Sequence, residues 1–453
     1  MTTQPSPTLP AYDHTPTPYN GISKSETLAL RQEFLSPAIL MYYRDPVMIV
    51  EGSMQYLFDE TGKRYLDGFA GIVTVSVGHC HPKVIEAVRE QNERFQHTTT
   101  IYMHPNIVTY AKKLASTFPK DSNLSVCYFT NSGSESNDLA LLIARAYTSN
   151  YDVIALRNAY HGMSPTSMGL TALNTWKTPV PQGFGIHHAK CPDQYRGPFG
   201  YDDAEAGPKY ASDVDEVIRF STPGKVAAFI AEPIQGVGGT VELPKNYLKH
   251  VYESVHNAGG LCISDEVQTG FGRTGTKFWG FENHGVTPDI VTMAKGMGNG
   301  APCGAVVTRP EIAQSLAQRL HFNTFGGNPV SMAQCEATLD IILDENIQGR
   351  ALDIGSYLMD GLRSLQTNHQ CIGDVRGKGL MIGVEIVEDL KSKSPASTLC
   401  ADVFERAKDL GLLIGKGGLY GNVLRIKPPM CITRDDVDFM IRVLDIAFTQ
   451  ASK

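Results

Sequence analysis

Short apolar runs alternate with helical patterns through the middle of this chain. Six runs have the length and composition expected of buried strands, at residues 126–129, 152–156, 226–231, 261–263, 290–293 and 304–308. After the first run, apolar residues recur at helical spacing from Leu139 to Tyr147. Strand-then-helix units repeated from about residue 100 to 340 predict an α/β fold with a mostly parallel sheet flanked by helices.

The flanking parts of the chain carry other patterns. Residues 54–67 alternate around Glu60-Thr61-Gly62 as a β-hairpin does, and a helix is expected from Pro82. Residues 183–213 are rich in Gly, Pro, Asp and Tyr and predict a long irregular excursion. Beyond residue 341 the pattern predicts a strand, a helix and a second strand, at 380–387, 396–410 and 423–426.

Charged residues follow two of the predicted buried strands. Asp265 and Glu266 come after the run at 261–263, and Lys295 follows the run at 290–293 and precedes several glycines. In an open α/β sheet, ligand sites form at the carboxyl ends of strands. A lysine desolvated among small residues suits a Schiff-base nucleophile, and a nearby aspartate suits a heterocyclic nitrogen that must stay protonated. The pair predicts pyridoxal phosphate chemistry, in which Lys295 holds the aldehyde and Asp265 keeps the pyridinium electron-poor.

Two other interpretations of the same stretch compete with this one. A lysine that precedes glycines is more often a solvated charge in a loop. In addition, Gly270-x-Gly272-x-x-Gly275 matches the dinucleotide fingerprint, which requires a helix directly after the glycines. Residues 276–281 have no helical periodicity, so the fingerprint is weak evidence for a dinucleotide.

A polar loop, residues 131–135, lies between the run at 126–129 and the helix that follows. Backbone N–H groups and the dipole at a helix N-terminus attract an anion, so Gly133 and Ser134 would cradle a phosphate. Alone, this pattern is more often an ordinary helix cap. Beside Asp265 and Lys295, it favours a phosphate site.

Tyr160 is the aromatic residue best placed to contact a ligand. Tyr160 follows the run at 152–156 and precedes His161 and a glycine, so it can stack on a planar ring. Tyr42, Tyr43 and Val73 are expected to pack in the core.

Composition narrows the class of protein. The chain has 453 residues, which exceeds one ordinary core, so we expect two domains or one large domain with a smaller partner. Its 42% hydrophobic and 19% charged residues are typical of a globular enzyme. A net charge of −7 without a basic stripe argues against nucleic acid as a partner. No apolar run is long enough to span a membrane. The nine cysteines form no C-x-x-C pair, which predicts reduced thiols, and His79-Cys80-His81 lacks the further ligands of a metal site, so no metal is expected.

Several motifs together carry a resemblance that is more specific than any one of them. They are NSGSE at 131–135, AYHG at 159–162, EPIQG at 232–236, SDEVQTGFGRTG at 264–275, AKGMGNG at 294–300 and FNTFGGNP at 322–329. The chain resembles the class III aminotransferases of the fold-type I pyridoxal-phosphate enzymes, over nearly all its length after residue 25. Finer stretches, such as GDVRGKGLMIG at 373–383 and RIKPPMCIT at 425–433, are similar to the alanine–glyoxylate aminotransferase 2 group.

The resemblance implies a role for each candidate site residue. Lys295 would carry pyridoxal 5'-phosphate as a Schiff base, with Asp265 on its ring nitrogen, Gln268 on its phenolic oxygen, and Tyr160 and His161 against its ring. Gly133 and Ser134 would bind its phosphate, as would Thr324 from the other subunit of a homodimer. Arg425 would bind the substrate α-carboxylate, and Glu232 would mask Arg425 when a different side chain must be accommodated.

The resemblance also implies a reaction. We expect a ping-pong transamination in which L-alanine and glyoxylate become pyruvate and glycine. Other ω-aminotransferases, acting on ornithine, acetylornithine, 4-aminobutyrate or a β-amino acid, remain as alternatives, as does a related phospho-lyase. Amino acids and keto acids are the expected partners, besides a second copy of the chain. A dehydrogenase or a binding protein fits the motifs far less well.

The sequence also indicates domain boundaries and a cellular compartment. We expect a flexible arm at 1–25, which holds five prolines in its first 18 positions, and a large cofactor-binding domain at 96–340. Residues 26–95 and 341–453 would form the smaller α+β domain. The resemblance implies the mitochondrial matrix, and the lack of a recognisable transit-peptide pattern keeps the cytoplasm as the alternative.

Overall fold

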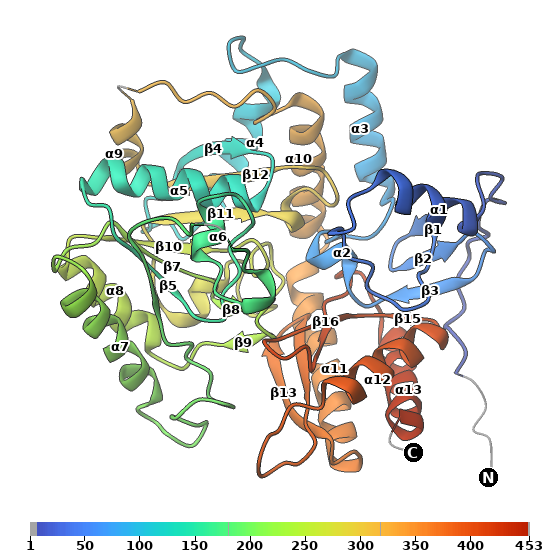
Figure 1. The fold of residues 1–453 in the computed structure, drawn as a ribbon. Helices are drawn as coiled ribbons and strands as arrows, with labels where there is room; N and C mark the ends of the chain where they lie inside the picture. The colour runs from blue at the N-terminus through green and yellow to red at the C-terminus, as the bar shows by residue number, and fades with distance from the viewer. Residues whose placement is uncertain (1–6, 180, 318, 452–453) are drawn as a thin grey trace.

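The computed structural model describes residues 7–179, 181–317 and 319–451, and its largest element is a seven-stranded sheet (Figure 1). The strand order is β4-β12-β11-β10-β7-β5-β6. These strands are β4 (Val126–Thr130), β5 (Val153–Leu156), β6 (Ile186–Ala189), β7 (Ala228–Ala231), β10 (Leu261–Asp265), β11 (Ile290–Ala294) and β12 (Gly304–Thr308). Only β12 runs against its neighbours, so the predicted α/β fold with a mostly parallel sheet is confirmed.

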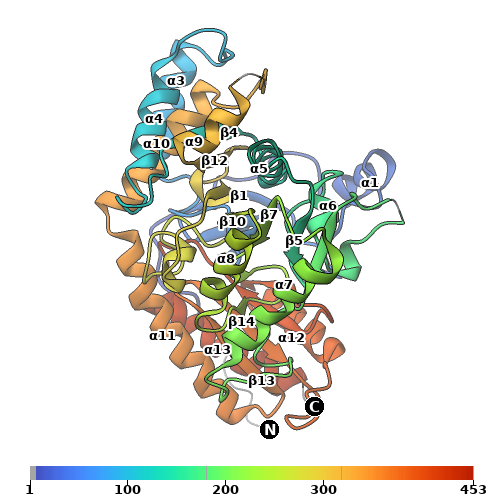
Figure 2. The ribbon, with the colours of Figure 1, turned by 90° about the vertical axis from the view of Figure 1, so that its left-hand side faces the viewer.

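Helices cover both faces of this sheet because its strands are apolar on both faces. Ile230 and Ile263 pack toward α5 (Gly133–Thr148), whereas Phe229 and Cys262, each one residue earlier, pack toward α7 and α8. The helices α7 (Ala206–Ser221) and α8 (Tyr247–Asn257) therefore lie on the side of the sheet away from α5 (Figure 2). The period-2 alternation of side chains along each strand produces this three-layer arrangement.

The described structure also contains two four-stranded sheets, the first of which joins distant parts of the chain. The first has the order β1-β2-β3-β15, in which the hairpin strands β2 (Tyr56–Asp59) and β3 (Arg64–Asp67) are those predicted around Gly62. Its other strands are β1 (Ile49–Ser53) and β15 (Leu412–Leu413), and β15 pairs parallel with β3. An N-terminal segment and a C-terminal segment thus share one sheet.

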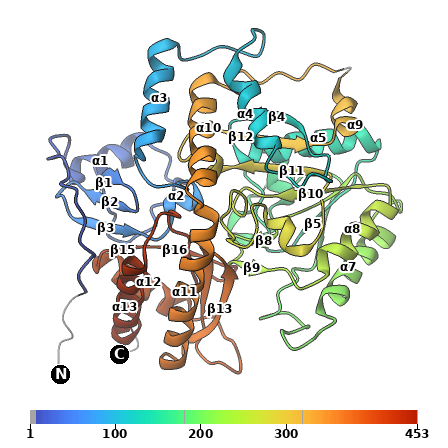
Figure 3. The same cartoon turned by 180° about the vertical axis from the view of Figure 1, so that it is seen from behind.

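The second small sheet lies wholly in the C-terminal part. Its order is β13-β14-β17-β16, with β13 (Ile372–Lys378), β14 (Met381–Ile386), β16 (Gly415–Gly417) and β17 (Val423–Ile426). The helix α12 (Ser397–Asp409) packs against this sheet, and α13 (Arg434–Ala451) packs against α12. The helices α10 (Pro329–Asp344) and α11 (Ile347–Asn368) run in succession from the large sheet to this part of the molecule (Figure 3).

The remaining elements are short or peripheral. They are α1 (Lys24–Phe34), α2 (Ala70–Val73), α3 (Pro82–Arg94), α4 (Pro105–Ala115), α6 (Ser167–Leu170), α9 (Pro310–Ala313), β8 (Ile234–Gln235) and β9 (Val241–Glu242), with four 3₁₀ turns, η1 (Asn174–Trp176), η2 (Gly280–His284), η3 (Lys295–Met297) and η4 (Gln314–Leu316). Among the helices of the described residues, none is both long and apolar enough to cross a bilayer.

Part of the N-terminal arm, residues 1–6, lies outside the described residues. From Pro7 to Ile22 the chain forms no helix or strand, but side chains fasten it to β1. The Tyr12 hydroxyl lies 2.6 Å from Ser53 Oγ, and His14 Nε2 lies 2.6 Å from Glu51 Oε1. These contacts hold the described portion of the arm against the small sheet.

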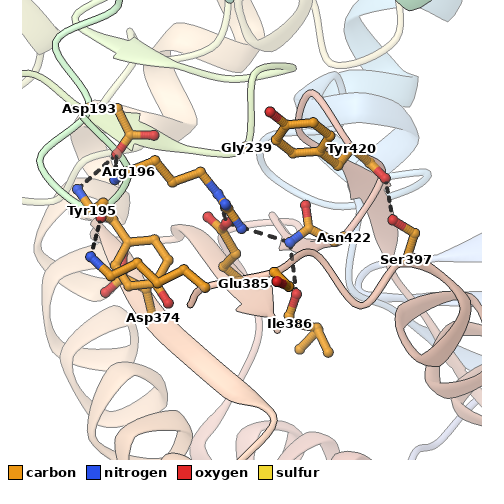
Figure 4. Close-up of polar contacts among 12 residues, drawn as sticks. Asp193, Tyr195, Arg196, Gly239, Asp374, Glu385, Ile386, Ser397, Tyr420 and Asn422 are labelled. Carbon is orange, nitrogen blue, oxygen red and sulfur yellow. Dashed lines mark hydrogen bonds and ion pairs between the residues drawn. The ribbon is translucent and has the colours of Figure 1, made fainter. Parts of the chain in front are cut away.

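The stretch 183–213 is less irregular than its composition indicated, because β6 and the start of α7 fall inside it. The loop between them is tied to the C-terminal sheet (Figure 4). Arg196 Nε donates to Glu385 on β14, and Lys393 Nζ donates to the backbone oxygen of Tyr195 over 2.6 Å. Arg376 on β13 also forms an ion pair with Glu385, at 2.6 Å. A buried ionic network therefore fixes this loop of the large sheet to the C-terminal part.

Candidate active site

The candidate site residues gather at one edge of the large sheet. The strands β4, β11, β10, β7 and β5 run parallel to one another, so their carboxyl ends meet there. A cavity of about 620 Å³ opens at this edge. Nine of the ten predicted site residues line it: Gly133, Ser134, Tyr160, His161, Glu232, Asp265, Gln268, Lys295 and Arg425.

Asp265, the last residue of β10, is held by three hydrogen bonds. Its Oδ2 accepts from Asn137 Nδ2 at 2.9 Å and from His161 Nδ1 at 2.7 Å, and its Oδ1 accepts from the backbone N–H of Val267 at 3.1 Å. The carboxylate is 3% exposed. A buried carboxylate with donors on both oxygens has a single orientation, which here faces the cavity.

Lys295 directly follows β11 and has a left-handed backbone, with φ of +46°. A non-glycine residue in this region is strained by roughly 1 kcal/mol or more, and such strain is common at functional sites. Desolvation, followed by the charge of Arg425, lowers the pKa of Lys295 to about 8, while Asp265 and Glu232 act in the opposite direction. The amine is therefore far closer to its nucleophilic neutral form at neutral pH than an ordinary lysine.

Arg425 reaches the cavity from β17, in register with Gly383 of β14 and Gly415 of β16. Its guanidinium lies 5.2 Å from the centre of the Phe69 ring and is 3% exposed. Burial, as the largest cause, lowers the pKa of Arg425. Among ion pairs between described residues, none involves Arg425, and its Nε has no hydrogen-bond partner there. An uncompensated buried guanidinium is a site for a carboxylate ligand.

Glu232 lies across the cavity at the end of β7. Its two carboxylate oxygens accept from the backbone N–H groups of Tyr160, at 3.1 Å, and Gly236, at 2.8 Å. Burial raises the pKa of Glu232. No ion pair joins Glu232 to Arg425 within the described structure, so the carboxylate does not mask the guanidinium in this conformation.

The predicted phosphate cradle lies at the first turn of α5. Ser132 caps this helix through its Oγ, which accepts from the backbone N–H of Glu135 at 3.2 Å. Ser134 Oγ accepts from the backbone N–H of Met163 at 3.2 Å. Gly162 has φ of +123°, and a Cβ built there would lie 2.2 Å from Ser134 Oγ. Only glycine permits this close approach of the loop at 159–162 to the helix N-terminus.

Thr324 is the predicted site residue that the structure places elsewhere. It is exposed, in the turn that precedes α10, and does not line the cavity of its own chain. This position is compatible with the predicted contribution to a second subunit, which remains a prediction.

Several cavity residues were not foreseen from the sequence. Asn137 anchors Asp265, and the Trp176 ring packs at 69° against Tyr160 with centroids 5.2 Å apart. Tyr42 and Tyr43 line the cavity. The placement of Tyr42 in the core was wrong, because its side chain is 38% exposed, whereas Val73 is buried as expected.

Among the described residues, one group outside the cavity has ligand atoms close enough together to hold a metal ion. His256, Cys262 and Asp289 bring such atoms within 4.8 Å of one another at the opposite end of β10. Both oxygens of Asp289 already accept hydrogen bonds, however, one from His256 Nε2 at 2.8 Å and the other from a guanidinium nitrogen of Arg309 at 2.6 Å. The adjacent Arg309 would repel a metal ion, so this group carries no metal assignment.

The cavity matches pyridoxal phosphate in the chemistry of its groups. A helix N-terminus with Gly133 and Ser134 suits a phosphate, a fixed carboxylate suits a ring nitrogen, and a lysine amine of lowered pKa suits an aldehyde. The close approach of Gly162 to Ser134 leaves backbone rather than side chain at the phosphate end. The His161 ring contacts Asp265 through Nδ1, and its Nε2 is buried without a hydrogen-bond partner among the described residues. The residues present therefore fit the cofactor.

Comparison with known proteins agrees with this geometry. The family profile described as aminotransferase class-III matches residues 41–448. The chain is 52% identical to the Arabidopsis thaliana protein named alanine–glyoxylate aminotransferase 2 homolog 2, mitochondrial, over 98% of this chain and 91% of that protein.

Two solved structures show the same fold. A phospholyase from Arthrobacter in complex with phosphoethanolamine is 35% identical, with a TM-score of 0.87 over 93% of this chain and 99% of that one. A PLP-bound amine transaminase from an uncultivated Pseudomonas species is 30% identical. Its TM-score is 0.87, over 92% of this chain and 99% of that one.

The chain belongs to the class III aminotransferases, which are pyridoxal-phosphate-dependent enzymes. It is an aminotransferase, and among its relatives it is similar to alanine–glyoxylate aminotransferase 2.

Proposed function

We propose that this enzyme transfers the amino group of L-alanine to glyoxylate, with pyruvate and glycine as products. The observation that carries the proposal is the buried guanidinium of Arg425, which lines the cavity with Lys295 and forms no ion pair with a carboxylate among the described residues. Alanine and glyoxylate each present one carboxylate and a very small remainder. The name of the Arabidopsis relative supports the same substrates.

Each cavity residue has a role in this proposal. Lys295 would hold the cofactor covalently, Asp265 would keep a proton on its ring nitrogen, and Gln268 would donate to its phenolic oxygen. Tyr160 and His161 would contact the ring, and Gly133 and Ser134 would bind the phosphate. Bound there, pyridoxal phosphate supplies an electron sink for the bonds at the substrate α-carbon.

The protein groups then bind the substrate and move its proton. Arg425 fixes the α-carboxylate through two parallel N–H···O bonds, which orients the α-carbon toward Lys295. The Lys295 amine, freed when the substrate amine takes its place, acts as the general base for the α-proton. Its lowered pKa allows that role near neutral pH.

Glu232 would act on substrate choice. Masking of Arg425 requires its carboxylate to leave the two backbone N–H groups of Tyr160 and Gly236, an exchange that costs two charge-assisted hydrogen bonds. We infer that small substrates such as alanine leave Glu232 where it is. Donors with a distal amine would depend on the exchange.

Assembly and compartment belong to the same proposal. Thr324 would complete the phosphate site of a second subunit, so the enzyme would be a homodimer with shared sites. The Arabidopsis relative is named as mitochondrial, which supports a mitochondrial location for this chain.

A second function has a specific observation in its favour. The Arthrobacter structure that shares 35% identity is a phospholyase bound to phosphoethanolamine. A panel of donors separates the two functions: alanine, 4-aminobutyrate, ornithine and phosphoethanolamine, with glyoxylate or pyruvate as acceptor. We expect alanine with glyoxylate to give the highest kcat/KM, and borohydride reduction to leave the cofactor on Lys295. Release of inorganic phosphate from phosphoethanolamine at a higher kcat/KM would replace the proposal with the phospho-lyase.

A further inference from the structure

Lys427 is a fully buried lysine directly behind the active-site cavity. It follows β17, two residues after Arg425, so the alternation of side chains directs both to the same side of the sheet. Its side chain is 0% exposed. Lysine is almost never fully buried without a paired carboxylate, yet no ion pair between described residues involves Lys427. Because burying an unpaired lysine costs free energy, this placement indicates a specific role for Lys427.

The Lys427 amine makes two hydrogen bonds. Nζ donates to Gln268 Oε1 at 3.1 Å and to the backbone oxygen of Gly236 at 3.4 Å. Burial, and then the charge of Arg425, lower the pKa of Lys427 well below its ordinary value. Both acceptors belong to motifs at the cavity wall.

The side-chain amide of Gln268 is oriented by these contacts. Its Oε1 also accepts from an Arg425 guanidinium nitrogen at 3.4 Å. A guanidinium can only donate, so the oxygen end of the amide must face Arg425 and Lys427. A Cβ at Gly236 would lie 2.4 Å from the amide atoms of Gln268, which shows how closely the backbone there packs on it. Nε2, the donor end of the amide, is left for the cavity that Gln268 lines.

We propose that Lys427 is a positioning residue: its hydrogen bond to Gln268 Oε1 holds the amide so that Nε2 donates into the cavity, to the phenolic oxygen of the bound cofactor. The inference rests on the proposed function, which assigns Gln268 to that oxygen. The contact of Arg425 with Gln268 Oε1, at 3.4 Å, is longer than that of Lys427, at 3.1 Å. Arg425 must also bind the substrate carboxylate. Lys427 keeps Gln268 in place while Arg425 is engaged with substrate.

This role has a spectroscopic consequence. A donor on the phenolic oxygen withdraws electron density from the conjugated system, which makes the nitrogen that joins Lys295 to the cofactor less basic. Loss of the donor should therefore raise the pH at which the visible absorption of the holoenzyme changes. If Lys427 had only a structural role, its substitution would alter thermal stability. It would not change the midpoint pH of the absorption change in a way that depends on Gln268.

The experiment is a double-mutant cycle on the holoenzyme. The four proteins are the wild type, Lys427→Met, Gln268→Leu and the double variant, and each is titrated by its visible spectrum. Methionine keeps the length of lysine without a donor or charge. If Lys427→Met does not fold, Lys427→Gln, which retains a polar end group, takes its place. Lys408→Met is the matched control, because Lys408 is another buried lysine but pairs with Glu405 and Asp409.

We expect Lys427→Met to raise the midpoint by about half a pH unit or more. In the Gln268→Leu background the same substitution should have less than half of that effect, and Lys408→Met should have none. An unchanged midpoint, or an equal shift with and without Gln268, would overturn the inference, since the second result indicates a direct effect of charge. Failure of the proposed function would appear separately, as a wild type that forms no visible-absorbing complex or does not transaminate alanine.

Discussion

The side-chain amide of Asn137, on α5, donates a 2.9 Å hydrogen bond to Oδ2 of Asp265, at the end of β10. The same Asn137 nitrogen lies 2.8 Å from the backbone oxygen of His161, whose ring also donates to Oδ2. One asparagine thus connects helix α5, the loop at 159–162 and the central strand β10. The carboxylate has no freedom to turn away from a ring nitrogen in the cavity.

Asp265→Asn should reduce kcat for alanine and glyoxylate by at least about 100-fold, or roughly 2.7 kcal/mol of barrier. The amide carries no charge to hold a proton on the ring nitrogen, and its NH₂ group would face one of the three donors around Asp265. Steady-state kinetics of the reconstituted variant measure the effect. Asp138→Asn is the control, because Asp138, next to Asn137 in the sequence, accepts a hydrogen bond from Ser164 Oγ and does not line the cavity. A loss below about tenfold would remove Asp265 from its assigned role.

The parts of the site predicted from sequence are those set by local chain geometry. Asp265 ends β10, Lys295 directly follows β11, and Gly133 opens α5 shortly after β4, so the ends of the strands alone locate these residues. Because parallel strands end at one edge, the sheet brings these three residues together without further information.

The residues that were missed depend on pairings between distant segments. Tyr42 reaches the cavity because its hydroxyl donates to the backbone oxygen of Lys416, 374 positions away. Lys427 lies behind Gln268 only through the pairing of β17 with β14 and β16. Trp176 belongs to a short 3₁₀ turn without periodicity. No local pattern distinguishes such residues from ordinary core or surface positions.

Apoenzyme reconstitution should depend on the protonation of Lys295. Since the pKa of Lys295 is lowered to about 8, the reactive neutral amine predominates above that pH rather than above 10.5. The rate of covalent cofactor binding should rise with pH and level off above about pH 8. Because Arg425 contributes to the lowering, Arg425→Met should move the midpoint of this profile upward. Stopped-flow absorbance measures both profiles, and a midpoint near 10 in the wild type would contradict the prediction.

Subunit mixing tests the predicted role of Thr324. Thr324→Ala should weaken cofactor binding at the phosphate end, and Lys295→Ala should abolish catalysis. If Thr324 acts across an interface, a mixed dimer of the two single variants contains one site with both residues intact. Mixtures of the inactive Lys295→Ala chain with Thr324→Ala should then show tighter cofactor binding per active site than Thr324→Ala alone. The same affinity in both samples would indicate that Thr324 serves its own chain or no site.

The pair His256–Asp289 should make stability depend on pH. The hydrogen bond to Asp289 raises the pKa of His256 above its ordinary 6.5. Protonated His256 therefore stabilises the folded state fully below pH 6.5, and this contribution is lost as the pH rises through the folded-state pKa. His256→Gln should lower the thermal-unfolding midpoint of the apoenzyme at about pH 6 more than at about pH 9. An equal decrease at both pH values would show that the charge of His256 does not contribute.

Arg425→Lys tests the carboxylate site on which the substrate assignment depends. Lysine keeps the charge but lacks the planar fork that makes two parallel bonds to a carboxylate. Loss of a buried charged partner typically costs about 2–5 kcal/mol, so kcat/KM should fall at least ~30-fold for alanine and for glyoxylate alike. The losses should be similar because both substrates present their carboxylate to one guanidinium. Arg350→Lys is the matched control, since Arg350 donates to the backbone oxygen of Cys431 and does not line the cavity. If Arg425→Lys spares alanine, the carboxylate binds elsewhere and the alanine–glyoxylate proposal loses the observation that carries it.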